Sequence, residues 1–208
     1  FFMLEIEKWS SFLAPKREGI SDSELFGFWG ELHVLCFHVV DRLEPIAAID
    51  SYVALEDAPQ DLAAKDFTIE VKTTTHKSPK RISISSLDQL DAWPARQLLA
   101  LILISRTDTG LSVRDLIVEI EARISSDVRA LRKFRLAASK KLESASEIQL
   151  NERFSADSEV AWEVRQDFPA LRRRETVAGI VDATYEIAIP DLTDFLMDYS
   201  IGDWIDAI

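Results

Sequence analysis

The sequence predicts an α/β fold, in which a mixed β-sheet is flanked by helices in the order helix, three strands, helix, strand. A C-terminal extension of helices and strands follows this core. Apolar residues recur with helical spacing from Leu25 to Leu43. Residues 67–74 alternate between apolar and polar side chains like a half-buried strand, and residues 97–105 form a dense apolar run that fits a buried strand.

The first helix has clear local signals. Ser21-Asp22-Ser23-Glu24 is a capping box that opens it, and Pro45 is expected to end it near Leu43. Gly27 and Gly30 weaken this helix relative to alanine, so we expect another part of the chain to approach it closely there.

The other elements follow from composition and turn signals, and all are predictions. We expect strands over 46–55, 60–63 and 67–74 with a hairpin loop around residues 64–66, a helix over 87–92, a strand over 97–105, helices from Ser112 and Asp127, strands over 160–164 and 183–189, and an amphipathic tail over 201–208. The chain is expected to divide into an N-terminal segment (1–20), a core (21–107) and C-terminal helices and strands packed on that core in the same domain (108–208).

Composition narrows the function classes. Of the 208 residues, one is cysteine, so a disulfide framework and a multi-cysteine zinc site are excluded. With only His33, His38 and His76 besides, a structural zinc site is not expected, and a cytoplasmic location is. The longest apolar run, Leu98–Ile104, is too short to span a bilayer, so we expect no membrane association. Because the chain opens with Phe1-Phe2-Met3, we expect it to be a fragment or a processed product that lacks an N-terminal region.

The net charge of −12 opposes nucleic-acid binding by the molecule as a whole. Any affinity for DNA is therefore expected to be local or supplied by a partner. Lys77, Lys80 and Arg81 directly follow the strand over 67–74, and they are the first candidates for phosphate contacts. His76 and Gln89 are further candidates. For His76 an ordinary loop histidine is the favoured interpretation, and for Gln89 a solvated helix glutamine is an equally good one.

The strand over 67–74 carries the most informative pair of charges. Glu70 and Lys72 are two residues apart, so their side chains project from the same face, whereas Ile69 and Val71 point the other way. A carboxylate and an ammonium on one face of a buried strand can hold a metal ion and position a water molecule. An exposed ion pair is the common alternative for Glu-x-Lys on a strand.

A metal site needs a second acid, and the hairpin supplies one. Asp66 is nearest in sequence, but it lies roughly 13 Å from Glu70 along an extended strand, too far to share one ion. Asp61 falls opposite Glu70 if the loop is Lys65-Asp66, and diagonal to Glu70 if the loop is Ala64-Lys65. Both registers place Asp61 and Glu70 on one face, about 5 or 7–8 Å apart between Cβ atoms.

Glu31 is the candidate for a third carboxylate, because a lone acid in an apolar helix is costly to bury unpaired. Its side chain therefore faces either solvent or the metal. Oxygen ligands of this kind select Mg²⁺ or Mn²⁺. The metal would polarise a phosphate and lower the pKa of a bound water, while Lys72 would orient that water or stabilise developing charge.

These residues and their order resemble the PD-(D/E)XK nuclease superfamily, and more narrowly a bacterial family of such proteins of unknown function found near restriction and phage-defence genes. The segments that carry the resemblance are 27–32, 60–62, 69–74, 76 with 82–90, 179–180 and 185–187. The resemblance implies a restriction-endonuclease-like core over 21–107. It also implies a Mg²⁺-dependent endonuclease that hydrolyses phosphodiester bonds of DNA in restriction or phage defence.

Three functions thus remain open. The first is this endonuclease, with Glu31, Asp61 and Glu70 as metal ligands and Lys72 as a catalytic residue, working as a homodimer or with partner proteins of a defence system. The second is a non-catalytic subunit that keeps the fold and binds protein or DNA in a larger complex. The third is a structural α/β domain whose Glu-x-Lys is a surface pair.

Overall fold

The computed structural model describes residues 19–52, 59–91 and 95–208. The helices are α2 (Asp22–Val34), α3 (Pro45–Ser51), α4 (Val113–Arg123), α5 (Val128–Leu142), α6 (Glu147–Asn151) and α7 (Ile201–Asp206). A π-helical segment, η1 (Leu35–Val39), continues α2, and the 3₁₀ segments are η3 (Leu87–Leu90), η4 (Arg173–Glu175) and η5 (Ile189–Phe195). The strands are β1 (Leu62–Ala63), β2 (Phe67–Thr74), β3 (Arg81–Ile84), β4 (Arg96–Ser112), β5 (Arg153–Glu163) and β6 (Tyr185–Ala188).

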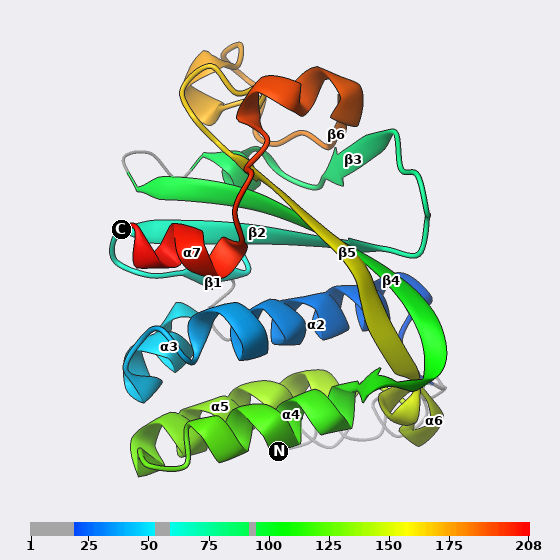
Figure 1. Cartoon of the computed structure of the whole chain (residues 1–208). Coiled ribbons are helices and arrows are strands. Elements are labelled where there is room, and N and C mark those ends of the chain that lie inside the picture. The colour runs from blue at the N-terminus through cyan, green and yellow to red at the C-terminus, as the bar shows by residue number, and fades with distance from the viewer. Residues whose placement is uncertain (1–18, 53–58, 92–94) are drawn as a thin grey trace, which may run out of the picture.

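The elements form layers around a four-stranded mixed sheet (Figure 1). Its strand order is β1-β2-β4-β5, with β2 and β4 parallel and the other two pairs antiparallel. Helices α2, α4 and α5 lie on one side of this sheet, and the small β3–β6 sheet lies on the other with the 3₁₀ segments (Figure 1). The predicted α/β class with a mixed sheet is therefore confirmed.

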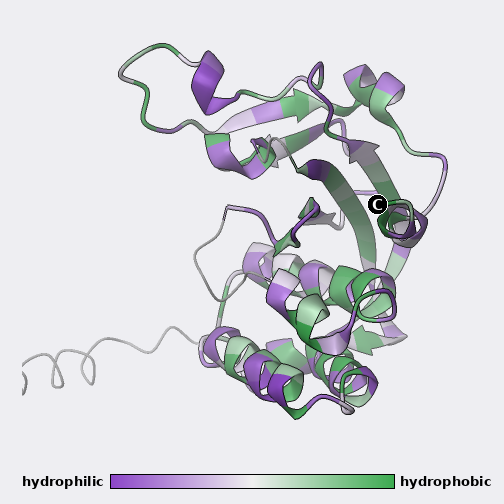
Figure 2. Ribbon diagram, turned by 90° about the vertical axis from the view of Figure 1, so that its left-hand side faces the viewer, coloured by the Kyte–Doolittle hydropathy of each residue, from purple (hydrophilic) through white to green (hydrophobic). Residues whose placement is uncertain are grey.

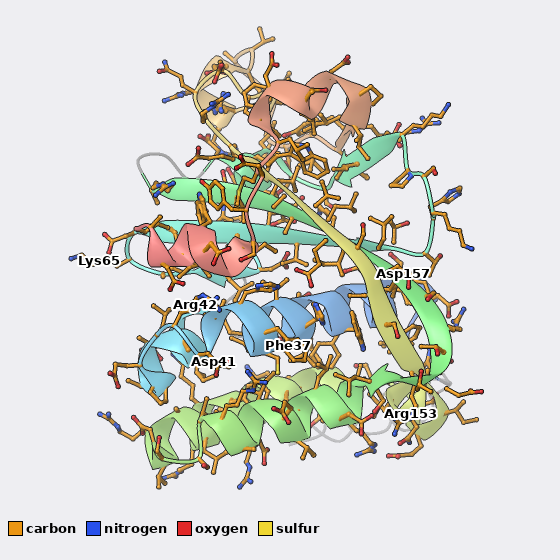
Figure 3. The ribbon with its side chains drawn as sticks, viewed as in Figure 1. Phe37, Asp41, Arg42, Lys65, Arg153 and Asp157 are labelled. Atoms are coloured by element: carbon orange, nitrogen blue, oxygen red, sulfur yellow. The ribbon has the colours of Figure 1, made fainter. Side chains whose placement is uncertain are left out.

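The β1–β2 hairpin has one of the two predicted registers. Leu62 pairs with Ile69 and Ala63 with Thr68, which leaves Lys65-Asp66 as the loop. Figure 3 labels Lys65 at this hairpin's end of the sheet. Extended by one residue, the same register places Asp61 directly opposite Glu70, which is one of the two arrangements that suit a shared cation.

The long strand β4 is buried on both faces and joins two hydrophobic cores. Leu98, Ala100 and Ile102 pack toward the helices, whereas Leu99 and Leu101 pack toward the β3–β6 sheet. Figure 2 accordingly shows the central strands as predominantly hydrophobic ribbon. An apolar run without polar alternation is typical of a strand covered on both sides, as the sequence predicts.

Helix α2 begins where the capping box predicts. The Ser21 side chain accepts a hydrogen bond from the backbone N–H of Glu24, whose side chain in turn accepts one from the backbone N–H of Ser21. Gly30 is closely approached, because a Cβ atom there would lie 1.9 Å from Thr73 Oγ1 of β2. The same expectation is wrong for Gly27, where a Cβ atom would meet nothing within 4 Å.

Helices α4 and α5 start at their predicted caps and form the outer layer. The Ser112 side chain accepts from the N–H of Asp115, and the Asp127 side chain accepts from the N–H groups of Arg129 and Ala130. Along the described ranges, no helix has both the length and the apolar character needed to cross a membrane.

Two predicted elements are wrong in type. Residues 46–51 lie in helix α3 rather than in a strand, because Pro45 occupies the first turn, where its missing N–H costs nothing. The rest of that predicted strand lies largely outside the described residues. The predicted helix over 87–92 is the single 3₁₀ turn η3, which ends at Leu90.

The structure also corrects the predicted element order of helix, three strands, helix and strand. Strand β3 leaves the main sheet and pairs antiparallel with β6, so Ile82 faces Ile187 across a separate two-stranded sheet. Strand β5 is longer than the predicted 160–164, and helix α6 was missed. Since the first predicted strand is a helix, the main sheet is completed by the late strand β5.

Candidate functional site

Glu70 and Lys72 project from the face of β2 that lies opposite α2. Their neighbours Ile69 and Val71 pack into the core on the helix side. Glu70 is 1% exposed, and its Oε1 lies 2.8 Å from Lys72 Nζ. Burial at this level excludes the interpretation of an exposed surface ion pair.

Asp61 joins this pair from the edge of the sheet. Its Oδ2 accepts a hydrogen bond of 2.8 Å from the backbone N–H of Val71, between the two charged residues of β2. This bond fixes the carboxylate beside the strand, and the charge of Glu70 acts on it directly. The two predicted carboxylates and Lys72 are thus brought together.

Glu31 is buried as well, but its partners are side chains outside β2. Its Oε2 accepts hydrogen bonds from Lys141 Nζ (2.6 Å) and from the hydroxyl of Tyr52 (3.3 Å). Within the described ranges, the ligand oxygens of Glu31, Asp61 and Glu70 do not all lie within 4.8 Å of one another. The reason is geometric, because α2 covers the face of β2 from which Glu70 points away.

The three carboxylates nevertheless share one electrostatic environment. Burial and the charges of Glu70 and Glu31 raise the pKa of Asp61 well above its usual range. Burial raises the pKa of Glu70 to about 7, although the neighbouring Lys72 acts to lower it. Burial and the charges of Glu31 and Asp61 likewise raise the pKa of Tyr52. The ammonium groups of Lys72 and Lys141 therefore leave part of the negative charge of the three carboxylates uncompensated.

A divalent cation fits the donors that are present. Glu70 Oε2 is buried without a hydrogen-bond partner among the described residues, and an acceptor left in this state is costly. A metal ion would satisfy it and would also relieve the repulsion from Asp61. Carboxylate oxygens are ligands that Mg²⁺ and Mn²⁺ prefer, so Asp61 and Glu70 are the residues that would hold such an ion.

Gln89 belongs to the site rather than to an outward-facing surface. Its Oε1 accepts from Lys72 Nζ (3.2 Å) and from the backbone N–H of Ser85 (2.7 Å). Gln89 therefore holds the lysine ammonium from the side of η3, while Glu70 holds it from the strand. The interpretation of a solvated glutamine is wrong.

The predicted basic cluster is exposed, but its members differ. Arg81 forms an ion pair of 2.8 Å with Glu186 on β6, so its charge is compensated. Lys77 and Lys80 are exposed and form no ion pair with the described residues. His76 is exposed as well, and its backbone N–H donates to Thr74 Oγ1. Lys77 and Lys80 thus remain the candidates for phosphate contacts.

Two residues at the site were not predicted from sequence. Tyr52 falls in the segment that was predicted as a strand, so it carried no signal. Lys141 is 110 residues from Glu31 in the chain, and the basic pattern of its helix suggested only a solvated face. Both become visible only when α3 and α5 pack beside α2.

One of three comparisons with known proteins found a match. No curated protein matches the chain, and no solved structure matches it either. A family model matches residues 2–190, which is nearly the whole chain and includes Glu31, Asp61, Glu70 and Lys72. The chain belongs to this family, which is described as "Putative PD-(D/E)XK family member, (DUF4420)".

Proposed function

We propose that this protein is a metal-dependent endonuclease that hydrolyses phosphodiester bonds of DNA, in restriction or phage defence. Membership of the family suggests a nuclease, and PD-(D/E)XK proteins typically use a divalent metal ion. The observation that carries the proposal is the buried arrangement of Asp61, Glu70 and Lys72, with Asp61 opposite Glu70 in the hairpin register.

Each residue has a distinct role in this chemistry. Asp61, fixed by the N–H of Val71, and Glu70, with its unpartnered Oε2, supply the ligand oxygens. A bound Mg²⁺ or Mn²⁺ would polarise the scissile phosphate and lower the pKa of a water molecule. Lys72, held by Glu70 and Gln89, donates hydrogen bonds to the attacking water or to the phosphate oxygens as negative charge develops there.

The surroundings offer places for a phosphate backbone. A cavity of about 340 Å³ borders Glu31 and is also lined by Lys140 and Lys141. The exposed Lys77 and Lys80 follow directly after β2. Lys77, Lys80 and Lys140, unlike Lys141, form no ion pair with the described residues, and they supply the local attraction that a chain with a net charge of −12 needs in order to approach DNA.

Incubation of the purified protein with supercoiled plasmid in Mg²⁺, Mn²⁺ or EDTA tests the proposal. We expect metal-dependent nicking or linearisation, which Lys72→Ala reduces by at least a hundredfold because it removes a group that acts in the transition state. Lys65→Ala is the matched control, since this exposed lysine lies in the hairpin loop. Intact plasmid in every metal, together with no metal binding by calorimetry, would reject the enzyme.

A non-catalytic subunit is the second candidate, and one observation favours it. Lys72 is engaged by two partners and Glu31 is engaged by Lys141, so this arrangement could serve stability alone. In that case the protein would bind a partner of the same defence system without cutting DNA. Lys72→Ala would then lower the unfolding temperature and leave no metal-dependent activity to lose.

A further inference from the structure

A second cluster of potential metal ligands lies away from the carboxylate site. His33 is on α2, His38 is on the π-helical segment η1, and Glu159 is on β5. Their ligand atoms all lie within 4.8 Å of one another. Figure 3 labels Phe37, which precedes His38, and Asp157, two residues before Glu159.

The donor atoms converge on the Glu159 carboxylate. His33 Nε2 lies 2.7 Å from its Oε1, and His38 Nε2 lies 2.7 Å from its Oε2. Despite this short distance, His38 Nε2 has no aligned hydrogen-bond partner among the described residues. A metal ion would give His38 Nε2 the partner that it lacks, and it would replace the hydrogen bond between His33 Nε2 and Glu159 Oε1.

The rings are held in place before any ligand arrives. His33 is 8% exposed and stacks on Trp29, with ring centroids 4.9 Å apart and an interplanar angle of 15°. The Trp29 indole N–H in turn donates to the carbonyl of Leu111 at 2.8 Å. The π-helical turn brings His38 to the same side as His33, five residues earlier in the chain.

We propose that His33, His38 and Glu159 form a binding site for a divalent transition-metal ion, with Zn²⁺ as the preferred ion. Two imidazoles and one carboxylate select such ions, whereas Mg²⁺ prefers oxygen ligands alone. Three protein ligands leave a fourth tetrahedral position for water. His38 is half-buried and Glu159 is exposed, so an ion can reach them from solvent.

The ligands need only a small adjustment to hold this ion. Around a tetrahedral Zn²⁺, ligand nitrogen and oxygen atoms are separated by about 3.4 Å, so each 2.7 Å contact must open by about 0.7 Å. Rotation of the Glu159 side chain, which is 30% exposed, can provide this opening. His33 Nδ1 lacks an acceptor among the described residues, so we expect micromolar rather than nanomolar affinity.

This site is separate from the carboxylate site. Glu31 and His33 are two residues apart on α2, and side chains at that spacing do not face each other. Glu31 is engaged by Lys141 and Tyr52, whereas His33 is engaged by Glu159. The zinc site therefore does not depend on the proposed nuclease activity.

Zn²⁺ titration of metal-free protein in excess Mg²⁺ tests the proposal by calorimetry, and Co²⁺ absorption in the visible range reports the coordination. The excess Mg²⁺ competes for carboxylate-only sites. We expect one bound Zn²⁺ per chain, with affinity lowered at least tenfold by His38→Ala or by Glu159→Gln. His76→Ala is the matched control, because this histidine is exposed on a loop and should leave binding unchanged.

A second measurement separates binding from misfolding. Zn²⁺ should raise the unfolding temperature of the wild-type protein and of His76→Ala, but not that of a folded His38→Ala. No bound Zn²⁺ in the folded wild-type protein would overturn the proposal, and so would equal affinity in His38→Ala. The cluster would then be a carboxylate shared between two imidazoles without a metal.

Discussion

Two glycines on one helix offer a test of how closely α2 approaches β2. A Cβ atom at Gly30 would lie 1.9 Å from Thr73 Oγ1 and 3.2 Å from Thr73 Cβ, whereas a Cβ atom at Gly27 would meet nothing within 4 Å. Alanine is a better helix former than glycine by about 1 kcal/mol at either position. The difference between Gly30→Ala and Gly27→Ala therefore isolates the cost of the contact.

The magnitude follows from the overlap. A separation of 1.9 Å forces helix and strand apart or twists the stiff Thr73 side chain, and overpacking of this kind costs about 1–3 kcal/mol. We expect Gly27→Ala to be neutral or stabilising by up to about 1 kcal/mol. Gly30→Ala should be less stable than Gly27→Ala by about 1–3 kcal/mol, which is about 2–12 °C in unfolding temperature for a chain of this size.

Urea unfolding of both variants, in the wild-type and in the Thr73→Ala background, is the assay. Thr73 Oγ1 has no partner among the described residues, so its removal leaves no buried group newly unpaired. In this background the difference between the two glycine variants should fall below about 0.5 kcal/mol. Equal stability of the two variants in the wild-type background would refute the close approach of α2 to β2.

Three further predictions concern ionisable groups. The pKa of Glu70 is raised to about 7, so the folded protein holds a proton that the unfolded protein releases, and stability falls as pH rises from about 4.5 to 7. Relative to Glu70→Gln, the wild-type free energy of unfolding should fall by up to about 3 kcal/mol across this window. Added Mg²⁺ should reverse this loss. Burial raises the pKa of Cys36 to about 12, so a thiol reagent at pH 8 should label it only after denaturation; rapid labelling of the native protein would contradict its burial. Lys141→Met should raise Mg²⁺ affinity severalfold by releasing Glu31, whereas the exposed control Lys140→Met should leave it unchanged in the same calorimetric titration.

The strand that carries Glu70 and Lys72 could be predicted from the sequence because its signals are local. Strand alternation fixes which face Glu70 and Lys72 share, and hairpin pairing leaves only two registers for Asp61, one of which the structure has. The caps at Ser21, Ser112 and Asp127 are likewise confirmed, since each depends on neighbours within three residues.

The errors have non-local causes. The apolar segment after Pro45 is compatible with strand or helix, and packing against α5 decides for the helix. Residues 82–84 alternate between apolar and polar side chains but were not predicted as a strand, and nothing in that segment indicates that it pairs with Tyr185–Ala188. Lys141 meets Glu31 across 110 residues of chain, a pairing that only the tertiary structure reveals.

Glu31 lies on the helix side of β2, apart from the charged pair Glu70 and Lys72. Because α2 covers the face of β2 from which Glu70 points away, the ligand oxygens of Glu31, Asp61 and Glu70 do not all come within 4.8 Å of one another in the described ranges. Lys141 supplies the positive charge that a buried carboxylate needs, at 2.6 Å, and does so without metal. Lys141 therefore competes with any cation for Glu31. Glu31 could join Asp61 and Glu70 as a metal ligand only if the lysine side chain moved into the adjoining cavity of about 340 Å³. The displaced Lys141 ammonium would then be free to pair with a substrate phosphate.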